Sequence, residues 1–229
     1  MSVPGRDTPA NGNGQAPGGR RVLVAMTGAT GAILGIRLLE AMRELGVETH
    51  LVLSEWAERT IRIETDYTVP QVRGLASIFY QRGNQAAPVS SGSFPMHGMA
   101  IIPCSMNTLA ALAHGLASEL IVRAADVMLK ERRTLVLVPR ETPLNAIHLR
   151  NMLLLSELGV SIVPPMPAFY NHPRSVDDIV GHIVARVLDQ FGIDNDLTTR
   201  WGISQHLHTM AALARAGVAP DGQSRQEPS

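Results

Sequence analysis

The chain has 229 residues, 45% of them hydrophobic, which is enough for one domain with a full apolar core. Lys plus Arg and Asp plus Glu both number 20, so a formal net charge of +0 favours neither a nucleic-acid nor a membrane partner. The single cysteine, Cys104, excludes an intrachain disulfide and indicates a reducing compartment. The sequence has no pattern of a secretory signal and no apolar run of bilayer length, so we expect a cytoplasmic protein.

Both ends of the chain are expected to be disordered tails. Residues 1–20 are rich in Gly, Pro, Asn and Gln, and residues 217–229 have a similar composition. Such segments bury too little apolar surface to offset the entropy lost on ordering. We therefore expect one folded domain over residues 21–216.

The stretch Arg21–Gly35 predicts a strand, a tight turn and the start of a helix. Val22–Ala25 is a short apolar run, Met26–Gly31 consists largely of small residues, and apolar residues at helical spacing begin at Ile33. Free backbone N–H groups at such a helix N-terminus favour an anionic group. The glycine spacing matches neither a dinucleotide nor a nucleoside-triphosphate motif, so a phosphate or flavin site and a plain turn both stay open.

Strands and helices alternate along the rest of the chain, except for Thr65–Pro95, whose weak periodicity predicts mostly loop. Further strands are predicted at Thr49–Leu53, Met99–Ile102, Thr134–Val138 and Val160–Val163. Helices are predicted at Trp56–Ile63, Thr108–His114, Leu120–Lys130, Leu144–Leu158 and Val176–Leu188. This alternation is typical of an α/β three-layer sandwich with a parallel sheet, which binds ligands beyond the carboxyl ends of its strands.

Polar residues follow these strands at their carboxyl ends. In chain order they include Thr27–Gly31, Ser54, Cys104–Thr108, Arg140-Glu141 and the Phe169-Tyr170 pair after the last strand. They supply hydroxyls, an amide, one cation and one carboxylate, but no His, Cys and Asp cluster with metal-ligand spacing. This set favours a phosphate-bearing organic cofactor over a metal.

Several of these residues also have ordinary structural interpretations. Arg140-Glu141 has two interpretations. Glu141 fits an acid at the start of a helix, paired with the neighbouring arginine. Equally, Arg140 fits a residue that binds phosphate, with Glu141 beside it as a carboxyl group that transfers a proton. Spacing alone favours a solvated helix face for Arg123 and Lys130, and a snorkelling role for Arg186. Cys104 is more often a small buried residue than a nucleophile, and Trp201 more often a packing anchor.

Seven segments, in order between about Arg21 and Trp201, resemble the flavin prenyltransferases of the UbiX type. They are Met26–Ala32, Glu64–Asp66, Ser90–Ser93, Pro103–Thr108, Arg123–Arg133, Leu137–Pro143 and Phe169-Tyr170. The segments that contain Lys130 and Arg140-Glu141 are the specific ones. The resemblance implies a Rossmann-like, flavodoxin-like fold in a homo-oligomer, usually a dodecamer.

The resemblance also implies a reaction. Enzymes of this family transfer a dimethylallyl group from dimethylallyl phosphate to N5 and C6 of reduced FMN, without a metal. The product, prenylated FMN, serves a partner decarboxylase of the UbiD type.

The resemblance also implies roles for the residues of this chain that match the family's functional positions. The positions that match FMN contacts are Gly28, Ala29, Thr30, Ser54, Ser105, Met106, Asn107, Thr108, Arg123 and Arg140. The positions that match the prenyl phosphate cradle are Ser90, Gly92, Lys130, Arg140, Tyr170 and Arg186. Glu141 matches the acid–base carboxylate, Glu64 a second proton-handling acid, and Trp201 an aromatic over the reacting prenyl group.

The chemistry agrees with these roles. Departure of phosphate from an allylic carbon builds negative charge that Lys130, Arg140 and Arg186 stabilise, and Glu141 protonates the leaving group. The positive prenyl fragment favours an aromatic face such as that of Trp201. Thr30 stands where many members have serine beside flavin N5, which keeps the hydroxyl for proton transfer on a stiffer side chain.

Two alternatives stay open, one from a related enzyme family and one that is not catalytic. A related FMN-dependent cysteine decarboxylase fits Pro103–Thr108, but it expects a histidine after the first or second strand and leaves Lys130 and Arg140-Glu141 unexplained. A non-catalytic flavin carrier or decarboxylase subunit is distinguished by tolerance of Glu141→Ala.

Overall fold

The computed structural model describes residues 19–202 and contains one six-stranded parallel sheet. The tails expected at 1–20 and 217–229 lie outside the described residues, apart from Gly19 and Arg20. The strands are β1 (Arg21–Met26), β2 (Glu48–Leu53), β3 (Ile78–Gln81), β4 (Gly98–Cys104), β5 (Thr134–Pro139) and β6 (Ser161–Ile162). Their spatial order is β3-β2-β1-β4-β5-β6.

The order of the strands reverses between β1 and β4. The chain moves outward from β1 through β2 to β3, then returns to pair β4 with the other side of β1. Because all strands are parallel, their carboxyl ends share one edge of the sheet, here called the carboxyl edge, and their starts share the amino edge. The switch point at the carboxyl edge is where such sheets bind ligands.

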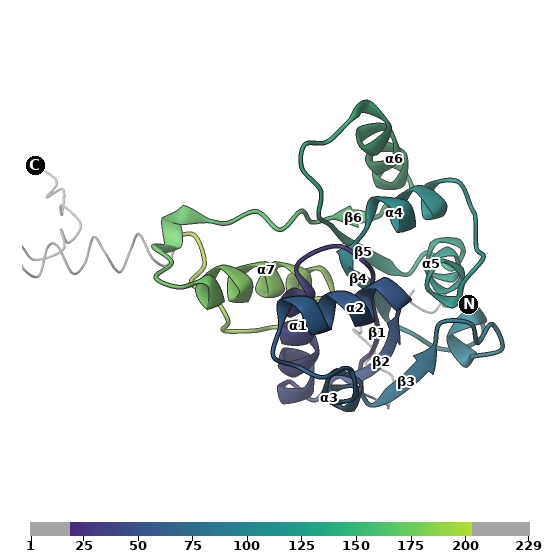
Figure 1. The fold of residues 1–229 in the computed structure, drawn as a ribbon, viewed down its shortest axis with the longest axis horizontal. Helices are drawn as coiled ribbons and strands as arrows, with labels where there is room; N and C mark the ends of the chain where they lie inside the picture. The colour runs from purple at the N-terminus through teal and green to yellow at the C-terminus, as the bar shows by residue number, and fades with distance from the viewer. Residues whose placement is uncertain (1–18, 203–229) are drawn as a thin grey trace, which may run out of the picture.

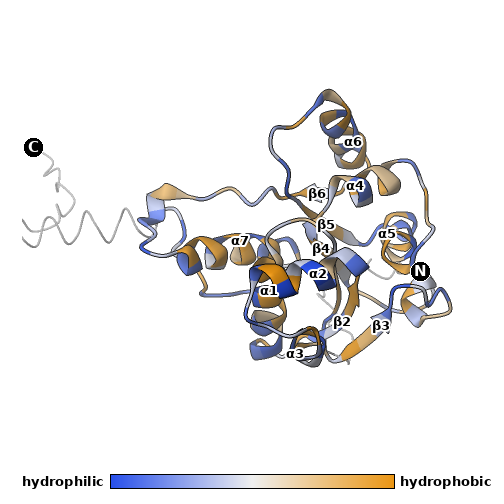
Figure 2. Ribbon diagram, viewed as in Figure 1, coloured by the Kyte–Doolittle hydropathy of each residue, from blue (hydrophilic) through white to orange (hydrophobic). Residues whose placement is uncertain are grey.

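Helices cover both faces because alternate residues of each strand point to opposite sides. Val22 and Val24 join one apolar cluster, and Leu23 and Ala25 join the other. The first cluster is covered by α1 (Ala32–Glu44), α2 (Glu55–Glu64), α3 (Val69–Leu75) and α7 (Val176–Gln190). The second is covered by α4 (Met106–Ala113), α5 (Leu120–Lys130) and α6 (Ala146–Glu157). Figures 1 and 2 show this α/β sandwich and confirm the expected fold.

Most of Thr65–Pro95 is loop, as expected, but the segment also contains short regular elements that the sequence did not predict. The segment contains α3, the edge strand β3 and a short 3₁₀ turn, η1 (Pro88–Ser90). Both regular elements are short, and β3 pairs only with β2, so neither has the long apolar pattern of a buried element. A local signal was available, since Thr68 and Gln71 form a capping box at the start of α3.

The chain after β6 also differs from the expectation. The strand has two residues, and Phe169-Tyr170 does not follow it at the carboxyl edge. Instead the proline-rich stretch of residues 163–168 runs away from the sheet to the 3₁₀ turn η2 (Phe169–Asn171), at one end of the molecule (Figure 1). Prolines hold φ near that of an extended chain, so this stretch neither bends back nor joins a helix.

No helix within residues 19–202 is long and apolar enough to cross a membrane.

Candidate functional site

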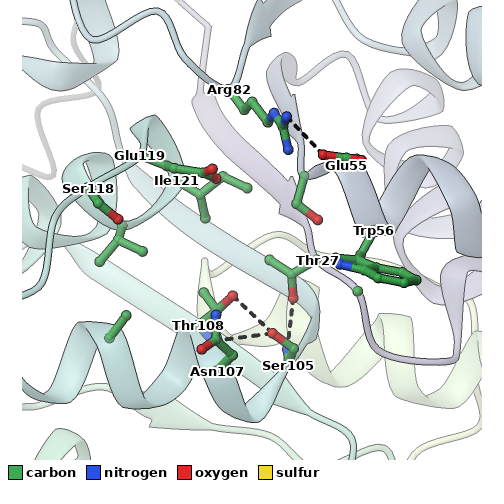
Figure 3. Close-up of a pocket in the computed structure, with 14 residues that line it drawn as sticks. Thr27, Glu55, Trp56, Arg82, Ser105, Asn107, Thr108, Ser118, Glu119 and Ile121 are labelled. Atoms are coloured by element: carbon green, nitrogen blue, oxygen red, sulfur yellow. Dashed lines mark hydrogen bonds and ion pairs between the residues drawn. The ribbon is translucent and has the colours of Figure 1, made fainter.

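A cavity of about 580 Å³ opens at the carboxyl edge, at the switch point between β1 and β4. Its lining comes from the ends of β1, β2 and β4 and from the beginning of α5, as Figure 3 shows. The residues that line it are Thr27, Gly28, Ser54, Glu55, Trp56, Arg82, Ser105, Asn107, Thr108, Ala111, Ser118, Glu119, Ile121 and Val122. The cavity wall therefore combines hydroxyl, amide and charged groups with some apolar surface.

Thr27 ties the two central strands together beneath this cavity. Its hydroxyl donates to Pro103 O (2.9 Å) and accepts from Ser105 N (2.8 Å), and its backbone N–H also donates to Pro103 O (3.1 Å). The residue is 2% exposed, so each of these groups depends on its protein partner. Thr27 thus fixes the position of Ser105 relative to β1.

Ser105 begins α4, and the first turn of this helix faces the cavity. Its Oγ accepts from Thr108 N (3.3 Å) and lies 3.0 Å from Thr108 Oγ1 (Figure 3). Asn107, in the same turn, is exposed to the cavity. Cys104 is fully buried, and burial raises the pKa of its thiol to about 12, which agrees with a packing residue and not a nucleophile.

Ser54 and Gly28 shape the side of the cavity nearest α2. The Ser54 hydroxyl caps α2 by accepting from Ala57 N (3.0 Å), and its backbone N–H donates to Met26 O (3.0 Å). A Cβ at Gly28 would overlap the Cβ of Trp56, so this position has no room for a side chain. The glycine turn therefore packs directly against α2.

Glu64 occupies the N-terminus of α1. Its Oε2 accepts from Gly31 N (2.8 Å) and Ala32 N (3.0 Å), while Gly31 adopts a φ of 101°. The anion that the strand-turn-helix pattern predicts at this point is thus a carboxylate of the chain itself. Thr30 lies in the same turn and is exposed.

Arg140 and Glu141 also lie at the carboxyl edge. Arg140 N donates to Cys104 O (3.2 Å), which places the residue beside the end of β4. Glu141 Oε1 accepts from Thr142 N (3.0 Å), and both residues are exposed. The structure therefore brings Arg140 and Glu141 next to the loop that contains Ser105.

Lys130 lies elsewhere, at the end of α5, with the Ser90–Gly92 segment beside it. Arg133 holds this segment in place by donating to Gly92 O (2.6 Å) and Phe94 O (2.8 Å). A Cβ at Gly92 would come within 2.6 Å of Lys130 Nζ. Lys130 forms an ion pair with Glu131, and that hydrogen bond lowers the pKa of the Glu131 carboxyl.

The strand β5 separates Lys130 from Arg140. Lys130 and Glu131 precede β5 at the amino edge, whereas Arg140 follows it at the carboxyl edge. A strand of six residues is about 20 Å long, since each residue advances about 3.3 Å. Lys130 and Arg140 of one copy therefore cannot contact the same phosphate.

A third group of candidate residues surrounds η2. The rings of Tyr170 and Trp201 meet edge to face at 4.9 Å, and His182 lies 6.1 Å from Tyr170. The pKa of His182 is lowered, first by burial and then by the nearby Arg186. Arg186 is exposed and pairs with Asp189 (2.6 Å).

Arg123 lies one turn into α5, close to the cavity-lining residues of that helix, and pairs with Asp126 (2.8 Å). Within residues 19–202, no group of three or more His, Cys, Asp or Glu side chains is placed to hold a metal ion.

Sequence reasoning missed several cavity residues, of which Arg82, Glu55 and Trp56 are the most informative. Arg82 directly follows β3 and pairs with Glu55 (3.0 Å). Glu55 and Trp56 directly follow Ser54 at the end of β2. The rule that points to carboxyl ends would have found all three, had β3 been recognised and the rule extended past Ser54.

Residues 12–188 match the flavoprotein family. A probable UbiX-like flavin prenyltransferase of Escherichia coli O157:H7 is 60% identical over 182 residues, which cover 79% of this chain and 92% of the relative. The flavin prenyltransferase LpdB of Lactiplantibacillus plantarum is 49% identical, with 80% and 98% covered.

Solved structures give the same result. AnUbiX (PadA1), in complex with FMN and dimethylallyl pyrophosphate, is 56% identical with a TM-score of 0.80, covering 80% of this chain and 98% of that one. A dodecameric FMN-dependent UbiX-like decarboxylase from Escherichia coli O157:H7 is 60% identical, with a TM-score of 0.78 and coverage of 79% and 98%. The cysteine decarboxylase TvaF, at 14% identity and a TM-score of 0.56, shares the fold alone.

Proposed function

The chain belongs to the flavoprotein family, among its UbiX-like flavin prenyltransferases, and we propose that it joins a dimethylallyl group from dimethylallyl phosphate to N5 and C6 of reduced FMN. One observation carries the proposal: a cavity lined with hydroxyl and amide groups lies at the switch point, and Arg140, followed by Glu141, is hydrogen-bonded to Cys104, the neighbour of the cavity residue Ser105. This arrangement suits a phosphorylated substrate and a proton transfer.

The cavity fits FMN in size and chemistry. Sites for small ligands and cofactors usually measure about 300–1,000 Å³ and combine an apolar surface with a few directed polar groups. The residues proposed to bind FMN are Gly28, Ala29, Thr30, Ser54, Ser105, Met106, Asn107, Thr108, Arg123 and Arg140. Five of them, Gly28, Ser54, Ser105, Asn107 and Thr108, line the cavity.

The chain's own residues would then stabilise the charges that develop during prenyl transfer and would donate or accept the protons. Lys130, Arg140 and Arg186 stabilise the phosphate as it leaves the allylic carbon, and Glu141 supplies a proton to it. Thr30 lies in the turn after β1, and the carboxylate of Glu64, at the end of α2, accepts from the backbone of the same turn, where a second proton-handling group is proposed. Trp201 stabilises the positive prenyl fragment through its ring face.

These groups act together only if different copies share a site. Ser90, Gly92 and Lys130 lie at the amino edge, and Tyr170, Arg186 and Trp201 belong to the η2–α7 region at one end of the molecule (Figure 1). We therefore propose a homo-oligomer, in which the cavity of one copy receives the phosphate-binding groups of others. Oligomers with closed symmetry routinely place such groups opposite one another.

The surface of α6 supports assembly. Leu155 and Asn151 are buried, whereas Ile147, Leu149 and Leu153 are each more than half exposed. Leu144, Leu154 and Leu158 extend this apolar surface. An aliphatic patch of this kind normally contacts another chain, and the dodecameric relative indicates that the partner is a second copy.

Two wider predictions concern the use of the product and the location of the protein in the cell. We propose that prenylated FMN passes to a UbiD-type decarboxylase and that both proteins act in the cytoplasm. Addition of the released product to an apo-decarboxylase of that type tests the first, because only the prenylated flavin restores decarboxylation.

The direct test is anaerobic incubation with reduced FMN and either dimethylallyl phosphate or dimethylallyl pyrophosphate, followed by mass and absorbance measurements on the released flavin. A flavin heavier by one prenyl unit, formed from the monophosphate, supports the proposal. Unchanged FMN with both donors contradicts it, and decarboxylation of a cysteine-ended peptide in a parallel reaction identifies the related activity instead.

A further inference from the structure

Trp56 is the one aromatic side chain among the described residues that line the cavity. It lies in the first turn of α2 and is 61% exposed, although large aromatic side chains usually bury most of their surface. The mechanism described above gives this residue no role.

The position of the indole is fixed from two sides. The backbone of Gly28 packs against the Trp56 Cβ so closely that no side chain fits at position 28. The Arg59 guanidinium lies over the indole ring, 4.6 Å from its centroid, and is held there by Glu55 (2.8 Å). Glu55 also pairs with Arg82 across the cavity (3.0 Å), as Figure 3 shows. A network of charges thus orients an aromatic ring that still exposes most of its surface.

We propose that the Trp56 indole is the aromatic platform for the isoalloxazine ring of FMN, and so a positioning residue for prenyl transfer. Arg59 covers one face of the indole, and a planar aromatic ligand contacts the remaining surface at the cavity. The inference rests on the proposed function, because it assumes that FMN binds in this cavity.

Two physical effects support a flavin over an aliphatic ligand here. Aromatic rings in contact gain a favourable interaction beyond their area burial, which an aliphatic side chain does not supply. An oriented ring would also limit the angles at which a bound flavin can lie, which favours a single orientation for the reaction.

The test uses the full-length protein and FMN itself. The chain has two tryptophans, so Trp201→Phe leaves Trp56 as the single indole reporter. In that background we expect FMN to quench the Trp56 emission and to show a long-wavelength absorption shoulder typical of a stacked indole and oxidised flavin. Trp56→Leu keeps an apolar side chain but removes the ring, and should raise the Kd for FMN about tenfold.

Conservative and matched variants separate positioning from folding. Trp56→Phe retains a ring and should bind FMN within about twofold of the parent. Ile63→Ala, at an exposed position near the other end of α2, should bind as the parent does. Emission from Trp56 that stays constant at FMN saturation, or a Kd for Trp56→Leu equal to that of the parent, would overturn the inference while the proposed function stands. Absence of FMN binding by the wild-type protein would overturn both.

Discussion

Thr27 connects the end of β1 to the start of α4, a structural role that its sequence context did not predict. Replacement by valine keeps the shape but removes the hydroxyl, which leaves Ser105 N without its acceptor. We expect Thr27→Val to lower the free energy of unfolding by about 1–3 kcal/mol, because a buried donor loses its partner. Urea unfolding measures this, and Thr27→Ser serves as the control because it retains the hydroxyl. Equal stability of Thr27→Val and the wild type would contradict this role.

In the proposed reaction, Glu141 is the acid that protonates the leaving phosphate. Glu141→Gln keeps the size and the hydrogen-bonding capacity of the side chain but removes the acid. We expect FMN to bind normally while prenyl transfer slows by roughly two or more decades. Single-turnover kinetics with pre-bound reduced FMN measures the step, and an unchanged rate rules out the acid–base role.

At the residue scale, the sequence supplied candidate residues but not their positions relative to one another. Spacing alone left Lys130 as a solvated helix residue, and only the resemblance gave it a role. Glu64 could be recognised as an acid of interest, but its two backbone partners depend on how α2 returns to the turn after β1. Arg82 was missed because β3 was not predicted, and Trp56 because only Ser54 was considered at the carboxyl end of β2.

The pair of η2 and α7 brings a buried histidine into contact with aromatic and charged neighbours. His182 Nδ1 lies within hydrogen-bonding distance of Asn171 Nδ2 (3.1 Å) and Thr198 Oγ1 (3.2 Å), and Tyr170, Arg186 and Asp189 surround it. Because the pKa of His182 is lowered in the folded state, the unfolded chain binds the proton more readily. The stabilisation is therefore present above about pH 6.5 and is lost as the pH falls toward the folded-state pKa.

Thermal or urea unfolding at pH 7.5 and pH 5.5 tests whether the free energy of unfolding falls as the pH is lowered. We expect the wild type to lose more unfolding free energy between the two values than His182→Gln, which has no titrating group at that position. The same loss in both proteins would show that other groups cause the pH dependence.

The apolar surface of α6 makes a prediction about assembly. Leu153 is more than half exposed in one copy, so Leu153→Glu should leave the fold of the protomer intact. A charge placed inside an apolar interface opposes association, and we expect smaller species by size-exclusion chromatography with light scattering. Leu153→Met, which preserves the apolar surface, should assemble normally. Wild-type elution of Leu153→Glu would place the interface elsewhere.

At the element scale, prediction succeeded where an element has a long apolar pattern. α5 begins and ends where predicted, and α7 was found by its apolar stripe over the sheet. β3 and α3 were not found, because a short edge strand and a two-turn helix depend on contacts with β2 and with α1 and α2 more than on periodicity.

At the scale of the whole molecule, the direction of β5 keeps residues proposed for one site apart within a single chain. Lys130 and Arg140 are ten positions apart in sequence, yet β5 places them at opposite edges of the sheet. The sequence around Lys130 and Arg140 does not indicate whether each residue would act in its own copy or in a neighbouring copy. That distinction follows only from the direction of the strand and from assembly.

A mixing experiment tests the shared site. Lys130→Ala and Glu141→Gln should each be inactive alone, but co-expressed copies should regain about a quarter of the wild-type activity, since each shared site draws two groups from randomly mixed copies. As the matched control, Glu141→Gln mixed with Arg140→Ala should stay inactive, because both residues lie at the carboxyl edge of the same copy. Recovery in the first mixture alone supports a site formed by different copies. No recovery in either mixture would place Lys130 and Glu141 in separate functions, because the distance across β5 prevents them from acting within one copy.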